Sequence, residues 1–167
     1  MQLRLRRERP EDATTIYALT EAAFAGLPFS DGVEPRVIDA LRAAGALTLS
    51  LVATDANEIA GHVAFSPVAI NGRPSDWYGL GPVAVWPHRQ RNGIGQALIR
   101  EGLWRLQSMG AGGCVLLGAP AYYARFGFER DPRLHHAGGP AWAFQCLTLN
   151  GPRPVGEVSF HPAFDAP

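Results

Sequence analysis

A glycine-rich turn between a strand-like segment and a long amphipathic segment constrains this chain more than any other feature. Residues 89–98 read RQRNGIGQAL, with Gly93 and Gly95 one residue apart and no acid in the run. Residues 76–85 before it are typical of a strand, and residues 93–109 place apolar side chains on one face of a helix. A turn that opens a helix exposes backbone N–H groups at the positive end of the helix dipole, and glycine lets a ligand approach them. The order of elements therefore predicts an anion site, with a pyrophosphate as its natural ligand.

Two common pyrophosphate motifs do not fit this turn. All 15 basic residues are Arg, and a P-loop needs a Lys, as do Schiff-base and pyridoxal chemistry. The dinucleotide fingerprint needs Gly or Ala where this turn has Leu98, and a second match at 79–84 is followed by strand-like sequence instead of a helix. The remaining interpretation is a Q-x-x-G-x-G turn, Gln90 to Gly95, after an irregular strand, with Arg89 and Arg91 adding positive charge.

Composition indicates a soluble globular protein without a strong charge bias. The 167 residues are 47% hydrophobic and 18% charged, and 15 basic residues balance 15 acidic ones, so no global field recruits nucleic acid or an anionic membrane. Neither a signal peptide nor an apolar run of about 18 residues is evident, and we expect a cytoplasmic protein. Cys114 and Cys146 lie in apolar runs without ligand spacing, which predicts buried free thiols and no metal site.

The remaining periodicities predict alternating helices and strands. We expect helices over 9–24 and 35–45 with a short one in 120–128, and strands over 3–7, 47–54, 59–70, 113–118, 141–149 and 156–164. The segment 131–140 is rich in Pro, Gly and His and is expected to be a loop. Since the apolar run at 113–118 follows a helix, as a βαβ crossover requires, it should run parallel to the strand over 76–85.

Two of these segments resemble the GNAT superfamily of N-acetyltransferases. PVAVWPHRQRNGIGQALI (82–99) is similar to its acyl-CoA signature, and AYYARFGF (121–128) is similar to its later short helix with a Tyr four residues before a Gly. GHVAFSPV (61–68) and GEVSFHPAF (156–164) further resemble the YhbS-like branch. One departure is Ala119, where that branch is expected to carry an Asp, so one side-chain contact to the cofactor is unaccounted for.

The resemblance covers roughly residues 1–149 and implies a fold. It implies one GNAT-type acyl-CoA-binding domain over residues 1–167, with a C-terminal strand and tail from about 150. The expected architecture is α/β, with a mixed central sheet splayed between two parallel strands, 76–85 and 113–118, and flanked by helices.

The resemblance also implies acetyl-CoA (coenzyme A) as cosubstrate, with no metal. Its pyrophosphate would be held by the N–H groups of the turn, and its pantetheine arm would pair with the backbone of Val83 and Val85. A backbone N–H in that strand would polarise the thioester carbonyl. The alternative is that Gly93 and Gly95 serve only a tight turn and close helix packing. The expected cofactor-binding residues are Val83, Ala84, Val85, Arg91, Asn92, Gly93, Ile94, Gly95, Gln96 and Tyr123.

The departing thiolate calls for a hydroxyl donor. Tyr122 and Tyr123 are adjacent, and on a helix their side chains diverge by about 100°, so only one can face the sulfur. The family's Tyr-x-x-x-Gly spacing, applied to Gly127, selects Tyr123 as the general acid. The alternative is that both rings serve only helix packing.

The acceptor amine must lose a proton before it attacks. For a lysine-like amine with a pKa near 10.4, this costs roughly 4.6 kcal/mol at pH 7, so a base or a water chain is expected. The candidates are Glu34 at a helix start, His62 in a strand and Asp76 at a strand entrance. Each also has a structural interpretation, as a helix-end charge, a hydrogen-bonded core residue and a turn residue respectively.

The expected function is transfer of an acetyl group from acetyl-CoA to a primary amine by direct attack. In this family residues 26–35 and 131–140 would border the acceptor pocket, and their Phe, Leu and Pro content favours a partly apolar acceptor. Zero net charge favours a small-molecule amine over a protein acceptor, and no nucleic acid or membrane partner is expected. A homodimer is left open. The alternatives are a non-catalytic acyl-CoA-binding sensor or interaction module, and a nucleotide-binding regulator.

Overall fold

The computed structural model describes residues 1–165 and divides them into two compact units. The first unit comprises residues 1–65, 81–102 and 162–165, and the second comprises residues 66–80 and 103–161. Three elements contribute residues to both units: strand β3 (Glu58–Ile70), strand β4 (Arg73–Val85) and helix α3 (Ile94–Ser108). A single domain over residues 1–167 stays a prediction.

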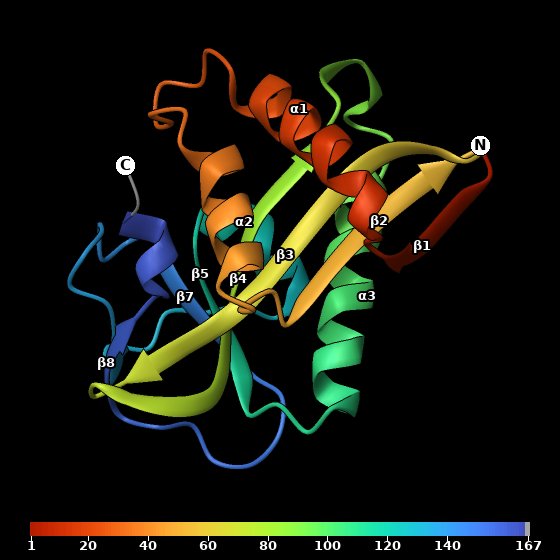
Figure 1. The fold of residues 1–167 in the computed structure, drawn as a ribbon. Helices are drawn as coiled ribbons and strands as arrows, with labels where there is room; N and C mark the ends of the chain where they lie inside the picture. Colours follow the sequence, from red (N-terminus) through yellow and green to blue (C-terminus); the bar gives the residue numbers. More distant parts are fainter. Residues whose placement is uncertain (166–167) are drawn as a thin grey trace. The chain divides into compact units, whose positions relative to one another are not determined.

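The N-terminal part of the first unit consists of antiparallel strands and two helices that cover them. Besides its parts of β3, β4 and α3, the unit contains β1 (Leu3–Arg7), η1 (Pro10–Asp12), α1 (Ala13–Phe24), α2 (Glu34–Ala43), β2 (Leu49–Asp55), η2 (Pro87–Arg89) and η4 (Pro162–Asp165). Strand β2 lies between β1 and β3 and is antiparallel to both. Helices α1 and α2, red and orange in Figure 1, lie over β2, where Ile16, Ile38 and Val52 form one buried cluster. The apolar face of each helix thus packs on an apolar side chain of the sheet.

Helix α3 packs closely on strand β3, because each element carries a glycine at the contact. A Cβ on Gly61 would lie 3.0 Å from Ile94 and 3.1 Å from Leu98. Gly102, two turns further along α3, similarly leaves room for the ring of Phe65. Any larger side chain at these glycines would displace the helix. The first turns of α3 therefore pack closely on β3.

The second unit contains the parallel strand pair that the sequence predicts. Besides its parts of β3, β4 and α3, it contains β5 (Gly113–Leu117), α4 (Pro120–Tyr123), η3 (Ala124–Phe126), β6 (Leu134–His135), β7 (Phe144–Thr148) and β8 (Gly156–Ser159). Strand β5 is parallel to β4, with Trp77 opposite Gly113, and antiparallel to β7. Strand β8 is antiparallel to β3 and parallel to β6. The core of the unit includes Trp77, Val115 and Phe144.

The predicted mixed α/β architecture is confirmed, and two segments need correction. Cys114 and Cys146 are buried and free, as expected. The expected loop 131–140 contains the short strand β6, because it pairs with β8, a partner too distant in sequence for a local pattern to show. The strand expected over 156–164 ends at Ser159, before a proline that cannot donate a ladder hydrogen bond. No helix within the described residues is long and apolar enough to cross a membrane.

Candidate active site

The glycine-rich turn of the first unit is fixed by hydrogen bonds on its N-terminal side. The indole of Trp86 donates to Ile59 O at 3.0 Å, and the side-chain amide of Gln90 donates to Val85 O at 3.1 Å. The guanidinium of Arg89 lies 2.5 Å from the carboxylate of Asp55. The carboxylate of Asp55 therefore neutralises Arg89, whereas Arg91, the other arginine expected to add positive charge, has no ion pair with any residue that the structure describes.

Backbone conformation makes the turn open just before α3. Arg91 and Gly93 have positive φ angles of 67° and 79°. A Cβ on Gly93 would meet no atom within 4 Å, so the space beside this residue is open. The carbonyl of Gly93 accepts from Ala97 N at 3.0 Å and so starts the helix, whose first N–H groups have no intrahelical acceptor. Open space beside such donors fits the pyrophosphate of coenzyme A.

The strand segment before the turn departs from regular geometry at one glycine. Gly81 has a φ of 135°, and the Gly81–Pro82 peptide bond is cis. After it, Val83 is half-buried, whereas Ala84 and Val85 are buried. The remaining predicted cofactor-binding residues follow in the same unit: Arg91 and Asn92 are exposed, Ile94 is buried, and Gly95 and Gln96 are half-buried. The structure thus gathers all the predicted residues except Tyr123 into one unit.

Tyr123 belongs to the second unit and packs at the end of β5. A Cβ on Gly118 would lie 2.5 Å from its ring, so glycine there lets the phenol approach the strand end closely. Rings of Phe126 and Phe128 lie 6.0 Å from it, centroid to centroid. Burial, with smaller contributions from Tyr122 and Cys114, raises the pKa of Tyr123 to about 12. Its hydroxyl is therefore protonated at neutral pH and can donate a hydrogen bond or a proton.

The neighbouring Tyr122 has different surroundings. Its ring meets that of Tyr123 edge to face at 4.9 Å and lies under the guanidinium of Arg125 at 4.4 Å. Arg125 also donates to the Tyr122 carbonyl at 2.8 Å. The two tyrosines thus occupy distinct environments, as the helical divergence of adjacent residues requires.

His62 is fully buried in a polar cluster between β1, β2 and β3. Its Nε2 lies 2.8 Å from Ser50 Oγ and 3.9 Å from Glu8 Oε1, and Ser50 Oγ donates to Glu8. Arg42 donates to both oxygens of Glu8, at 2.8 and 3.0 Å. Since the serine hydroxyl donates to the carboxylate, Nε2 carries the hydrogen that Ser50 accepts. Nδ1 has no hydrogen-bond partner among the described residues.

The environment of His62 keeps its imidazole neutral. Burial lowers its pKa to about 4, an effect that Glu8 opposes and Arg42 reinforces. The pKa of Glu8 is lowered in turn by hydrogen bonds from Arg42 and Ser50, which outweigh the opposing effect of burial. With none of its side chain exposed, His62 has the surroundings of a structural hydrogen-bonding residue rather than of a base that meets an amine from solvent.

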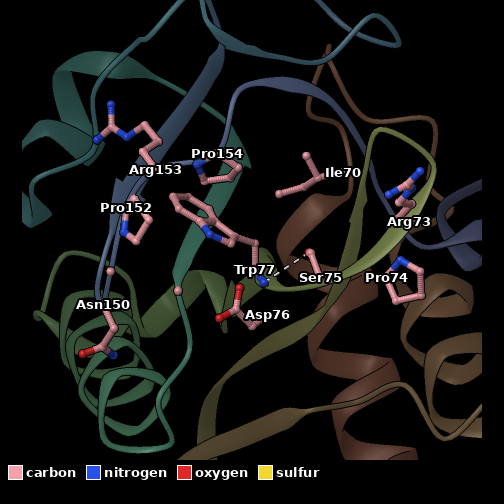
Figure 2. Close-up of a pocket in the computed structure, with 12 residues that line it drawn as sticks. Ile70, Arg73, Pro74, Ser75, Asp76, Trp77, Asn150, Pro152, Arg153 and Pro154 are labelled. Carbon is pink, nitrogen blue, oxygen red and sulfur yellow. Dashed lines mark hydrogen bonds between the residues drawn. The ribbon is translucent and has the colours of Figure 1, made fainter.

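Glu34 and Asp76, the other candidate bases, lie in different units. Glu34 is the first residue of α2, and its carboxylate accepts from Ser30 Oγ at 2.7 Å, which closes the loop between α1 and α2. Asp76 lines a pocket of about 500 Å³ in the second unit, beside Trp77 and Gly112. Figure 2 shows Asp76 next to the Trp77 indole, with Arg73 and Arg153 further away.

The structure does not bring Asp76 and Tyr123 together. Gly112 precedes β5 and donates its N–H to Asp76 O at 2.9 Å, whereas Tyr123 packs on Gly118, just past the other end of β5. Six residue steps of extended chain span roughly 20 Å. Asp76 therefore lies too far from Tyr123 for the two to flank one reacting group.

A smaller pocket lies near the Tyr123 end of β5, and it is lined largely by the segment 131–140. It measures about 250 Å³, and we call it the β6–β7 pocket after the strands at its edge. Gly118 N donates to Ala143 O at 3.0 Å, and the side-chain amide of Gln145 donates to Gly118 O at 3.0 Å. These bonds fix the segment before β7 beside the end of β5. The lining residues are Arg130, Asp131, Pro132, Leu134, His135, His136, Ala141 and Phe144.

A metal centre finds no support in the described residues, where no group of three or more His, Cys, Asp or Glu is placed to hold an ion. The first unit offers backbone donors at the turn, and the second unit offers a protonated phenol and the β6–β7 pocket. These are parts suited to binding a phosphate-bearing cosubstrate and to moving protons.

Comparisons with known proteins show the family of the chain. Residues 4–130 match the model of the acetyltransferase (GNAT) domain. The chain is 41% identical to the uncharacterized N-acetyltransferase YhbS of Escherichia coli K12, over 96% of this chain and 98% of that protein. A GNAT family acetyltransferase from Brucella melitensis in complex with acetyl-CoA is 51% identical, with a TM-score of 0.89 over 98% of this chain and 99% of that one. The crystal structure of Escherichia coli YhbS in complex with CoA is 36% identical, with a TM-score of 0.88 over 99% and 93% of the two chains. The chain belongs to the GNAT family of acetyltransferases.

Proposed function

We propose that the chain transfers an acetyl group from acetyl-CoA to the primary amine of a small molecule. The observation that carries the proposal is the open turn before α3, where Gly93 leaves free space beside the first N–H groups of the helix. Two relatives of known structure hold acetyl-CoA or CoA. The proposed cofactor-binding segments are Val83–Val85 and Arg91–Gln96.

The proposed chemistry is direct attack of the amine on the thioester. The amine nitrogen forms a bond to the acetyl carbon, the carbon–sulfur bond breaks, and the sulfur takes up a proton. The Tyr123 hydroxyl, protonated at neutral pH, is the proposed donor to that sulfur. A backbone N–H in Val83–Val85 is the proposed donor to the carbonyl oxygen. No covalent enzyme intermediate is needed, because positioning and proton transfer suffice.

The β6–β7 pocket is the proposed acceptor site. The resemblance expects residues 131–140 to border the acceptor, and this pocket is lined largely by that segment. Its volume of about 250 Å³ suits a small molecule better than a folded protein partner. Leu134, Pro132 and Phe144 provide apolar surface, and Arg130 provides a cation for an acidic group on the acceptor.

A panel of amines tests the proposal. Each amine is incubated with acetyl-CoA, and release of free thiol is measured, with calorimetry of acetyl-CoA binding alongside. The panel pairs amines that carry a carboxylate with amines that lack one, because Arg130 lines the pocket. We expect thiol release that depends on the acceptor. Binding of acetyl-CoA without such release would support the alternative of a non-catalytic acyl-CoA sensor, and absence of binding would refute both.

A further inference from the structure

The β6–β7 pocket contains an imidazole that is held in one orientation. His136 Nδ1 lies 2.8 Å from Val158 O. A carbonyl oxygen only accepts, so Nδ1 carries the hydrogen, and the lone pair of the neutral ring is on Nε2. The ring is further fixed between Phe144, at 5.8 Å, and Phe160, at 4.8 Å between centroids. An imidazole held in this way can take up a proton at one defined atom.

Glycine at position 138 keeps that atom accessible. A Cβ on Gly138 would lie 2.8 Å from His136 Nε2, closer than real Cβ atoms approach other atoms. Any other residue at this position would cover the nitrogen or push the ring away. His136 itself is half-buried, so that it is shielded on its Phe144 and Phe160 sides and open on another.

The other groups of the pocket are less suited to take a proton. Asp131 accepts hydrogen bonds from Arg133 and Arg153, which hold the pKa of its carboxyl well below the usual range. His135 is exposed, and no hydrogen bond of the described residues orients its ring. The remaining charged or titratable groups around the pocket are Arg130 on the lining, Cys146 on β7, Glu157 on β8 and His161 just after β8.

His136 and Tyr123 lie on opposite faces of the end of β5. Leu117 is paired with Phe144, and a Cβ on Gly139 would lie 3.1 Å from Leu117 and 3.8 Å from the His136 ring. The His136 ring is therefore on the face to which Leu117 points. A Cβ on the next residue, Gly118, would meet Tyr123 and Leu116 instead. Because successive side chains of a strand alternate between its faces, Tyr123 lies on the other face.

We propose that His136 is the general base that removes the proton from the acceptor amine, an inference that rests on the proposed function. As nitrogen bonds to the acetyl carbon, its proton passes to His136 Nε2, and Tyr123 gives a proton to the sulfur as the carbon–sulfur bond breaks. Solvent then returns both side chains to their starting forms. The base acts on the nitrogen and the acid on the sulfur, which are different atoms of the tetrahedral intermediate, so the two groups need not lie on the same face of β5.

The substitution His136→Asn tests the proposal. The side-chain amide of Asn can still donate to Val158 O, but it offers no basic nitrogen. We expect kcat for an amine identified by the panel to fall by 10²–10⁴-fold and acetyl-CoA affinity to stay unchanged. In His136→Ala, added imidazole should restore part of the activity, because the pocket is open to solvent.

The outcomes separate this inference from the proposed function. Absence of thiol release by the wild-type protein with every amine would overturn both. Two results would overturn the base assignment alone. One is wild-type turnover together with a kcat of His136→Asn within about threefold of the wild-type value. The other is a loss of activity in His136→Ala that imidazole does not restore.

The pair Gly138→Ala and Gly139→Ala adds a steric check. The methyl group of the first meets Nε2, whereas that of the second meets the flexible end of Leu117. Only Gly138→Ala is expected to lower kcat strongly. Equal effects of Gly138→Ala and Gly139→Ala on kcat would contradict the assignment of His136 as the base.

Discussion

His62 in the first unit and His136 in the second form hydrogen bonds of the same length with opposite consequences. Each has one ring nitrogen 2.8 Å from an oxygen, Ser50 Oγ for His62 and Val158 O for His136. His62 is sealed in the protein, and burial lowers its pKa to about 4. His136 is half-buried and lines a pocket, with glycine beside its free nitrogen.

The difference shows that a hydrogen bond orients an imidazole but does not decide its role. A buried ring stays neutral at pH 7 where its burial outweighs the attraction of a nearby carboxylate, and it then contributes to stability. A ring with an accessible second nitrogen can exchange a proton with a ligand. We therefore expect substitutions near His136 to change turnover and substitutions at His62 to change stability. The predictions below test this division, from the largest expected effect to the smallest.

Loss of the Tyr123 hydroxyl should give the largest fall in kcat. It tests whether a residue of the second unit donates the proton to the sulfur. In Tyr123→Phe the ring contacts are kept and the proton donor is removed. We expect kcat at saturating acetyl-CoA to fall by 10²–10⁴-fold, or less where chemistry is not rate-limiting, while cofactor affinity is retained. The matched control is Tyr122→Phe, whose ring has a different environment on the same short helix. A greater loss in Tyr122→Phe would show that the two roles are reversed.

Local patterns predicted the turn and the helix after it, but not the surroundings of the candidate acid–base residues. Gly93 and the helix after it form a continuous stretch, so its positive φ and its open space follow from neighbouring residues. The orientation of His136 depends on Val158, 22 residues further along the chain, and no periodicity indicates that bond. Asp76 is an exposed residue near a turn, and its distance from Tyr123 follows only from the pairing of β4 with β5. Sites made of backbone are thus easier to predict than sites made of distant side chains.

The acid stability of the protein tests the structural role of His62. Its pKa is about 4 in the folded state and about 6.5 in the unfolded chain. Between these values the unfolded chain binds the extra proton, so the free energy of unfolding decreases as pH falls from 6.5 towards 4. We expect His62 to account for a decrease of about 2 kcal/mol between pH 7 and pH 5.

Urea unfolding of the wild type and of His62→Gln at both pH values gives the measurement. The variant should be less stable at pH 7, because it disturbs the bond to Ser50, but its stability should change less with pH. An equal change with pH in both proteins would mean that His62 is protonated in the folded state, and it would remove the distinction drawn between the two imidazoles.

The substitution Gly93→Val should weaken cofactor binding without removing catalytic groups, and its expected effect is the smallest of the three. A branched side chain would occupy the open space beside the first N–H groups of α3, where the pyrophosphate is proposed to lie. Loss of one hydrogen bond to a charged group corresponds to about tenfold or somewhat more in the Kd of acetyl-CoA. Strain contributes as well, because Gly93 has a φ of 79°. Gly110→Val is the matched control, since Gly110 has a φ of 85°, is equally open and follows the other end of α3. Calorimetry should show weaker acetyl-CoA binding for Gly93→Val alone. If both variants lose affinity equally, the effect belongs to backbone strain, and the turn before α3 is not the pyrophosphate site.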